Sequence, residues 1–266
     1  MSRPGSIVVG GQRLETEWWG PRPDAAPSLV LLHEGLGCVA LWRDFPETLV
    51  AATGLGVFAF SRAGYGRSDP VRLPRPLSYM HDEARDVLPR VLDAAGISRC
   101  VLVGHSDGAS IATIYAGSVR DARVRGLALI APHFFVEDVT IASIAAIRAT
   151  YGQGRLRNRL ARYHARVDVA FRGWSDAWLN PGFRGWDITR QLATIEAPML
   201  LLQGSEDRYG TTAQLRVAER AARCPVRSVV IEGAEHSPHL EASGPTIDEV
   251  GRFARDVLQH ELYCHS

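Results

Sequence analysis

The sequence places a serine among small residues at the end of an apolar run, in VLVGHSDGAS at residues 101–110. Gly104 and Gly108 stand two positions before and after Ser106, which is the spacing G-x-S-x-G. A strand that turns sharply into a helix at this serine needs small neighbours, and it lifts the hydroxyl above the sheet edge at the helix amino terminus. A tight turn that needs only small side chains is the alternative. The apolar run before Ser106 and the helical pattern after it favour a nucleophile.

A serine hydroxyl is a weak nucleophile until a nearby base removes its proton. His236 is the candidate base, because it lies in IEGAEHSPHLE, directly after the last predicted strand. His239, later in the same segment, is the rival base. A histidine base in turn needs a carboxylate, which fixes its tautomer and stabilises the imidazolium.

Asp207 is the predicted carboxylate, because LLLQGSEDRYG places it in the loop after the penultimate strand. The order Ser106, Asp207, His236 is nucleophile, acid and base, and all three follow predicted strand ends, where parallel sheets place ligands. We therefore predict that they form a catalytic triad. The alternative acids are Glu206, Glu137 and Asp138.

The elements that must position these residues follow from the alternation of short apolar runs with helical patterns. An antiparallel hairpin is predicted at residues 6–9 and 15–19, around Gly10 and Gly11. Further strands are predicted at residues 28–33, 56–60, 100–103, 124–130, 199–203 and 226–231. Helices are predicted at residues 79–95, 106–117 and 246–259. Strands separated by helices indicate an α/β fold, a mostly parallel sheet with helices on both faces.

Residues 134–195 interrupt this alternation, because they contain no convincing strand but many tryptophans and arginines. We predict a helical cap inserted after the sixth strand. The domain organisation is then a first core part at residues 1–133, the cap at 134–195, and a second core part at 196–266.

Within the cap, RLRNRLARYHAR predicts an amphipathic helix whose arginines meet water while its apolar residues pack inward. The inward residues are expected to be Leu156, Leu160 and Tyr163. The alternative is that the arginines hold an anionic substrate, such as a carboxylate or a coenzyme A thioester.

The composition points away from several classes of partner. The 266 residues carry a formal net charge of +1, so no global field recruits nucleic acid or an anionic membrane. No apolar segment reaches the length of a membrane span, and the amino terminus does not resemble a secretory signal. The scattered cysteines fit thiols of a reducing compartment, and they are Cys38, Cys100, Cys224 and Cys264. We expect a cytoplasmic protein with no metal and no cofactor; a homodimer is compatible with the sequence.

The motifs HEGLG, SRAGYGRSD, GHSDG, QGSEDRYG and EHSPH together resemble those of the α/β-hydrolase superfamily, over roughly residues 28–254 apart from the insertion. The resemblance implies an eight-stranded, mostly parallel sheet, a cap after the sixth strand, and cofactor-free hydrolysis through an acyl-enzyme. We predict a serine hydrolase that acts on a small ester, thioester or lactone. The alternatives are cleavage of a carbon–carbon bond in a dienoic ring-fission product, and a catalytically silent protein that binds a small ligand.

A tetrahedral intermediate needs hydrogen-bond donors for its oxyanion. We expect the backbone N–H of Asp107 to be one donor, and the Gly35 amide in LLHEGLG to be the other, with Leu36 as the alternative. Glu34 and Asp107 put two acids beside this site, which disfavours a negative transition state unless they point away or are paired. Our hypothesis is that they face a cap arginine or a polar substrate group.

Other residues near the motifs are expected to contact the substrate or to brace loops. Aromatic walls would suit an apolar or aromatic acyl group. The substrate-contact candidates are Glu34, Leu36, His133, Phe134, Trp174, Trp178 and His239. His105 is expected to be a buried packing histidine and His33 to brace its loop through hydrogen bonds, while Arg62 and Ser68 are expected to tie down the AGYG loop.

Overall fold

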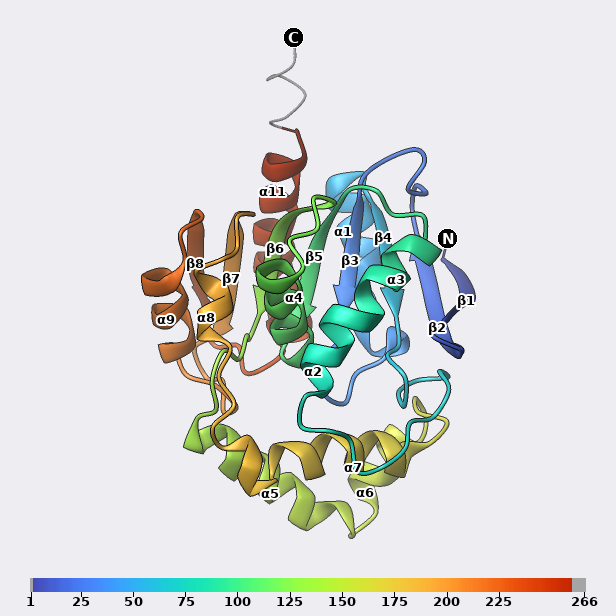
Figure 1. Ribbon diagram of the computed structural model, residues 1–266, viewed down its shortest axis with the longest axis vertical. Coiled ribbons are helices and arrows are strands. Elements are labelled where there is room, and N and C mark those ends of the chain that lie inside the picture. The colour runs from blue at the N-terminus through green and yellow to red at the C-terminus, as the bar shows by residue number, and fades with distance from the viewer. Residues whose placement is uncertain (1, 260–266) are drawn as a thin grey trace.

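One eight-stranded sheet forms the centre of the computed structural model, which describes residues 2–259 (Figure 1). The spatial order of the strands is β1-β2-β4-β3-β5-β6-β7-β8. Strand β2 is antiparallel to β1 and β4, and the other neighbouring pairs are parallel. The predicted mostly parallel sheet is confirmed. The strands are β1 (Arg3–Val9), β2 (Gln12–Trp19), β3 (Ser28–Leu32), β4 (Gly56–Phe60), β5 (Cys100–His105), β6 (Val124–Ile130), β7 (Met199–Gly204) and β8 (Val226–Ile231).

Helices cover both faces of the sheet (Figure 1). Along β3, Leu29 and Leu31 pack in the apolar cluster under α1 and α11, while Val30 and Leu32 belong to the cluster on the other face. Both faces of the central strands are therefore dry, as their continuous apolar sequences require. The core helices are η1 (Val39–Trp42), α1 (Phe45–Thr53), α2 (Tyr79–Asp82), η2 (Glu83–Val87), α3 (Leu88–Ala94), α4 (Asp107–Ser118), α9 (Ala213–Ala221), α10 (Pro238–Glu241) and α11 (Ser243–Gln259).

The register of the parallel strands brings their carboxyl ends to one edge of the sheet. Leu32 of β3 pairs with Gly104 of β5, and His105 pairs with Ile130 of β6. At the other side, Gly204 of β7 pairs with Ile231 of β8. The loops that follow these strands therefore start level with one another, which is the condition for their side chains to meet.

A second group of helices connects β6 to β7. Figure 1 shows α5, α6 and α7 lying together across one end of the sheet. We call residues 138–192 the α5–α8 segment. It comprises α5 (Asp138–Tyr151), α6 (Arg155–Leu160), α7 (Val167–Trp178), η3 (Pro181–Phe183) and α8 (Thr189–Leu192).

The amphipathic helix predicted through RLRNRLARYHAR is shorter than expected, because α6 ends at Leu160. The chain then turns so that His164, which is 3% exposed, reaches the core loops. His164 Nδ1 accepts a hydrogen bond of 2.9 Å from the Gly66 amide, and Nε2 donates one of 2.9 Å to the Leu36 carbonyl. These two bonds join the α5–α8 segment to the loops after β4 and β3, and their geometry is incompatible with a continuing helix.

Three cysteines fall within the described residues, and all are free thiols. Cys38 and Cys100 are buried, which raises the pKa of each thiol to about 12. Cys264 lies outside the described residues. Across residues 2–259, we find no helix with the length and apolar character that a bilayer crossing requires.

The turn from β5 into α4 gives a test of the fold. A Cβ on Gly108 would lie 1.9 Å from the Leu32 carbonyl oxygen of β3, which is rigid backbone. We expect Gly108→Ala to lower the free energy of unfolding by about 2–3 kcal/mol, because the strand or the helix must shift.

The control is Gly152→Ala, where the residue has φ −62° and a Cβ would meet open space. This variant should be unchanged or stabilised by up to about 1 kcal/mol, since alanine restricts the unfolded chain. Urea unfolding followed by circular dichroism measures both. Equal stability of the two variants would contradict the close approach of α4 to β3.

Candidate active site

Ser106 occupies the sharp turn between β5 and α4. Its backbone has φ 53° and ψ −116°, a region that favours glycine and costs a residue with a side chain about 1–3 kcal/mol. Gly104 must be glycine, since a Cβ there would lie 2.5 Å from the Gly108 carbonyl oxygen. The side chain of Ser106 faces a cavity over the carboxyl ends of the strands.

The structure brings the predicted triad together. His236 Nε2 lies 3.0 Å from Ser106 Oγ, and His236 Nδ1 lies 2.8 and 3.0 Å from the two carboxylate oxygens of Asp207. Because a carboxylate only accepts, Nδ1 carries the proton and Nε2 is left as an acceptor for the serine hydroxyl. This is the tautomer that a general base needs.

Asp207 is held as a carboxylate by the loop after β7. Its Oδ1 accepts hydrogen bonds from the amides of Tyr209, at 2.7 Å, and Gly210, at 3.3 Å, and the Gln203 side chain donates to Oδ2. Burial by itself would raise the pKa of Asp207, but His236 and the Tyr209 amide outweigh it and hold the pKa below its ordinary value. The charge that orients His236 is therefore maintained.

The alternative residues of the sequence analysis have other partners. His239 is buried, with its ring 5.0 Å from Trp42 and 4.6 Å from His105, and it does not line the cavity. Glu206 is exposed, the Glu137 carboxylate accepts from Thr211 and Gln214, and Asp138 pairs with Arg184. These alternatives lie outside the hydrogen-bonded chain of three.

The loop after β3 runs along the cavity opposite His236. Gly35 lies beneath the Trp174 ring so closely that a Cβ would be 2.2 Å from it. Buried Arg62 donates to the carbonyls of His33 and Glu34, which turns these oxygens away from the cavity. Arg62 thus fastens this loop, whereas Ser68 bonds the Ser61 carbonyl within its own loop, as expected.

Glu34 is paired with a histidine, not with an arginine. His105 Nε2 donates to the His236 carbonyl at 2.8 Å, and His105 Nδ1 lies 3.5 Å from Glu34 Oε2. Burial by itself would raise the pKa of Glu34, but His105 overcomes this and holds it far below its ordinary value. His105 therefore links the loop after β3, the nucleophile turn and the loop of His236.

Asp107 points into the core, which corrects the hypothesis that it faces a cap arginine. Its carboxylate accepts hydrogen bonds of 2.5 Å from the Tyr79 hydroxyl and 3.2 Å from Trp178 Nε1. Burial raises the pKa of Asp107 above its ordinary value, although Arg62 and the two donors oppose the shift. Each of the two acids therefore lies against protein side chains, Glu34 beside His105 and Asp107 against Tyr79 and Trp178.

The cavity at Ser106 has a volume of about 490 Å³. Of the substrate-contact candidates, Glu34, Leu36, His133, Trp174 and Trp178 line it. Phe134 and His239 do not line it, which corrects their assignment as substrate contacts. Phe134 is 0% exposed, because its amide is held by Gln214 and its side chain turns into the core.

Other lining residues were not named as substrate contacts, although Leu156, Leu160 and Tyr163 were expected to pack inward and the cap arginines were considered as anion ligands. Tyr209 and Ser237 stand in quoted motifs, and the helical spacing of α5 could have indicated which of its side chains face inward. The lining residues not named as contacts are Leu41, Arg43, Thr140, Ile144, Ile147, Leu156, Arg159, Leu160, Arg162, Tyr163, Tyr209, Glu235, Ser237, Leu240 and Glu241.

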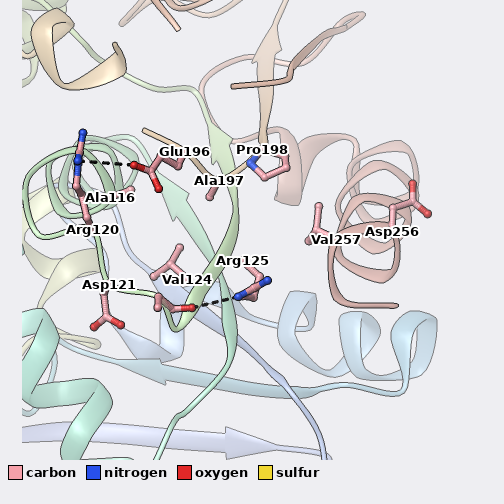
Figure 2. A pocket seen from close by; sticks show the side chains of 11 residues that line it. Ala116, Arg120, Asp121, Val124, Arg125, Glu196, Ala197, Pro198, Asp256 and Val257 are labelled. Atoms are coloured by element: carbon pink, nitrogen blue, oxygen red, sulfur yellow. Dashed lines mark hydrogen bonds and ion pairs between the residues drawn. The ribbon is translucent and has the colours of Figure 1, made fainter. Parts of the chain in front are cut away.

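A second hollow, of about 570 Å³, lies away from this site (Figure 2). It is formed where β6 and β7 begin, at Val124 and Pro198, and along α11 at Val257. An ion pair of 3.7 Å between Arg120 and Glu196 lies at its side. Since it is at the amino ends of the strands, it cannot share a ligand with Ser106.

The sequence matches a family model described as "Alpha/beta hydrolase family" over residues 29–249. It is 31% identical over 271 residues to "Putative carbamate hydrolase RutD" of Variovorax paradoxus, covering 92% of this chain and 94% of the relative. It is 25% identical over 279 residues to "Epoxide hydrolase 3" of Xenopus tropicalis, covering 90% of this chain and 73% of the relative. The crystal structure of proline iminopeptidase from Mycobacterium smegmatis has the same fold, with a TM-score of 0.78 at 17% identity, covering 97% of this chain and 100% of that one.

The buried histidine beside the triad predicts an acid-sensitive stability. Burial, aided by His236, lowers the pKa of His133 to about 3. In the unfolded chain a histidine titrates near pH 6.5. Between this pH and the pKa in the folded protein, the free energy of unfolding changes by about 1.4 kcal/mol per pH unit. The contribution of neutral His133 to the free energy of unfolding is therefore complete above pH 6.5 and is lost as the pH falls toward 3.

His133→Gln removes this titration, so its stability relative to the native protein should improve by about 1.4 kcal/mol for each pH unit below 6. Urea unfolding of both proteins at pH 7.5, 5.5 and 4.5 measures the difference. A difference that does not change with pH would show that His133 is not held neutral.

Proposed function

The chain belongs to the α/β hydrolase family, and on that premise we propose that it is a serine hydrolase of small esters, thioesters or lactones, with Ser106, His236 and Asp207 as its triad. The observation that carries the proposal is the continuous hydrogen-bonded path from Ser106 Oγ through His236 to Asp207, with steps of 3.0 and 2.8 Å. These lengths are within reach for proton transfer without a rearrangement of the site. The hydrolase family is established by the sequence, whereas the serine mechanism is our inference.

The proposed reaction has two halves. In the first, Ser106 Oγ attacks the substrate carbonyl while His236 Nε2 takes the hydroxyl proton and passes it to the leaving alcohol or thiol. In the second, His236 removes a proton from water, which attacks the acyl-enzyme and releases the acid with return of the proton to Ser106. Asp207 remains ionised throughout and stabilises the imidazolium.

We propose the amides of Asp107 and Gly35 as the oxyanion hole. Asp107 is the first residue of α4, where the initial N–H groups have no acceptor within the helix. Gly35 lines the cavity in the loop that Arg62 fastens. Leu36, the alternative, lines the same cavity and offers its carbonyl to His164.

The α5–α8 segment is proposed to act as a cap that selects the substrate. It contributes the apolar wall of the cavity, from Ile144, Ile147, Leu160, Trp174 and Trp178. Such a wall and a volume of about 490 Å³ suit a small apolar or aromatic acyl group. The boundaries 134–195 proposed for the cap enclose all the helices of this segment.

The names of the relatives include hydrolases of epoxides and of carbamates, which differ in the bond that is cleaved. The type of nucleophile in this chain favours one of these bond types over the other. A serine that opened an epoxide would leave a stable ether on the enzyme, with no carbonyl for water to attack. A serine that attacks an acyl carbonyl leaves an ester, which water can hydrolyse. Ser106 therefore favours an acyl substrate, and a carbamate offers the same kind of carbonyl.

We expect Ser106→Ala to lower kcat/KM for p-nitrophenyl acetate by about 10⁴- to 10⁶-fold, and Asp207→Asn by about 10³- to 10⁴-fold. The matched control is Glu206→Gln, beside Asp207 but exposed, which should leave kcat/KM unchanged. Near-native turnover by Ser106→Ala would exclude the proposed nucleophile.

Two further measurements separate the alternatives. A fluorophosphonate probe should label the native protein at Ser106 and leave Ser106→Ala unlabelled; an unlabelled native protein would favour a silent ligand-binding protein. Product analysis should find an acid with an alcohol or thiol. Release of a carbon fragment from a dienoic ketone, with inert esters, would instead favour carbon–carbon bond hydrolysis.

A further inference from the structure

Three arginines at the mouth of the Ser106 cavity have no acidic partner among the described residues. Arg43 follows η1, while Arg159 and Arg162 lie in and just after α6, and all three line the cavity and are exposed. Within residues 2–259, none of their guanidinium groups forms an ion pair with a carboxylate. In the described part of the chain, Arg162 Nε donates a hydrogen bond of 3.5 Å to the Arg159 carbonyl, and the Arg162 guanidinium lies 5.7 Å from the centre of the Tyr163 ring.

The acids of the cavity, in contrast, are already engaged by the protein. Glu34 lies beside His105, and Glu235 lies 3.5 Å from Arg208. Glu241 Oε2 accepts hydrogen bonds from the amides of Glu235, at 2.7 Å, and Ser237, at 3.3 Å. The three guanidinium groups therefore remain free of carboxylate contacts among the described residues, although the whole chain has a net charge of only +1.

Arg43 also has a strained backbone. Its φ of 52° and ψ of −127° are close to those of Ser106, in a region where glycine is favoured. Trp42 and Phe45 hold the segment in place, because both are 2% exposed and their rings stack at 5.7 Å. Strain of this kind on a residue that faces a cavity is typical of ligand sites.

The basic lining continues outward from the mouth. A groove on α5 and α6 shares Arg159 and Arg162 with the cavity and adds Arg155. By comparison, Arg157 of the same helix is bound to Asp168 at 2.6 Å and lines neither. A substrate that extends from Ser106 toward α6 would meet unpaired guanidinium groups along its path.

We propose that the substrate of this site carries an anionic oxygen group, a carboxylate or a phosphate, which Arg43, Arg159 and Arg162 bind at the cavity mouth. The inference rests on the proposed function, since it names the class of acyl compound that Ser106 attacks. Planar guanidinium groups match both anions with paired N–H donors. The apolar wall then holds the part of the substrate between the anion and the scissile carbonyl.

Two matched substrate pairs test the proposal and distinguish the two anions. The carboxylate pair is p-nitrophenyl hydrogen glutarate and p-nitrophenyl pentanoate, which have acyl chains of equal length. The phosphate pair is butanoyl-coenzyme A and the neutral S-butanoyl-N-acetylcysteamine. We expect about tenfold or higher kcat/KM for the anionic member of one pair, through a lower KM, with a smaller advantage at high salt. Ratios near one in both pairs would overturn the proposal.

Arginine variants locate the effect. Arg43→Gly, Arg159→Gln and Arg162→Gln should each reduce the anionic-to-neutral ratio by about three- to tenfold. Arg43→Gly should also raise the melting temperature by about 2–4 °C, because it relieves backbone strain. The control Arg157→Gln, on α6 but paired with Asp168, should leave the ratio unchanged. An unchanged ratio in the triple arginine variant contradicts the assignment.

A binding measurement keeps this test independent of turnover. Calorimetry with Ser106→Ala should give tighter binding of the preferred anionic compound than of its neutral partner, and the triple arginine variant of Ser106→Ala should lose the difference. If the native protein hydrolyses none of the four compounds, the proposed function fails while the ratio of dissociation constants still decides the anion site. Equal dissociation constants within both pairs would refute the anion site even if hydrolysis is observed.

Discussion

The approach of α4 to the end of β3 is the constraint on which the site depends. With hydrogen at the Gly108 Cα, the helix can start directly beside the Leu32 carbonyl, and Ser106 is forced into its strained turn. That turn aims the hydroxyl at the loops after β7 and β8, which bring Asp207 and His236. A looser turn would leave the serine, the histidine and the aspartate at the same edge of the sheet, but too far apart to form hydrogen bonds. The packing of the α4 backbone against the β3 backbone thus brings Ser106 Oγ and His236 Nε2 within the distance of a proton transfer.

The acidic side chains of the cavity contact other protein groups, whereas three arginines that line it contact no carboxylate of the described residues. Glu34 lies beside His105, and the Asp107 carboxylate accepts hydrogen bonds from Tyr79 and Trp178. Burial lowers the pKa values of His33, His133 and His239, and these neutral rings add no competing positive charge near His236. In residues 2–259 no cluster of His, Cys, Asp and Glu side chains has the arrangement of a metal site. Among the described residues that line the cavity, the arginines without a carboxylate contact are Arg43, Arg159 and Arg162.

Local patterns were most informative where one physical requirement dominates a short segment. β4, β6 and β8 coincide with their predicted ranges. For β4 and most of β6 the reason is burial, because a buried strand bounded by turns leaves an apolar run; β8 is only partly buried, and its valines and Ile231 mark it instead. α1 and α9 were not predicted, since each is short and its apolar face is visible only against the sheet. α6 ends earlier than its amphipathic pattern indicates, because His164 bonds to loops distant in sequence.

The sequence by itself determined the succession of the eight strands along the chain, the position of the turn at Ser106, and which serine, acid and base could act together, because each depends on residue type and local spacing. Tertiary structure alone decided that Asp107 bonds Tyr79 and Trp178, that Glu34 meets His105, and that Phe134 and His239 turn away from the cavity. It also decided which arginines of the α5–α8 segment stay unpaired at the mouth. Contacts of this kind join residues far apart in the chain, and their formation depends on the packing of whole elements, which no local pattern records.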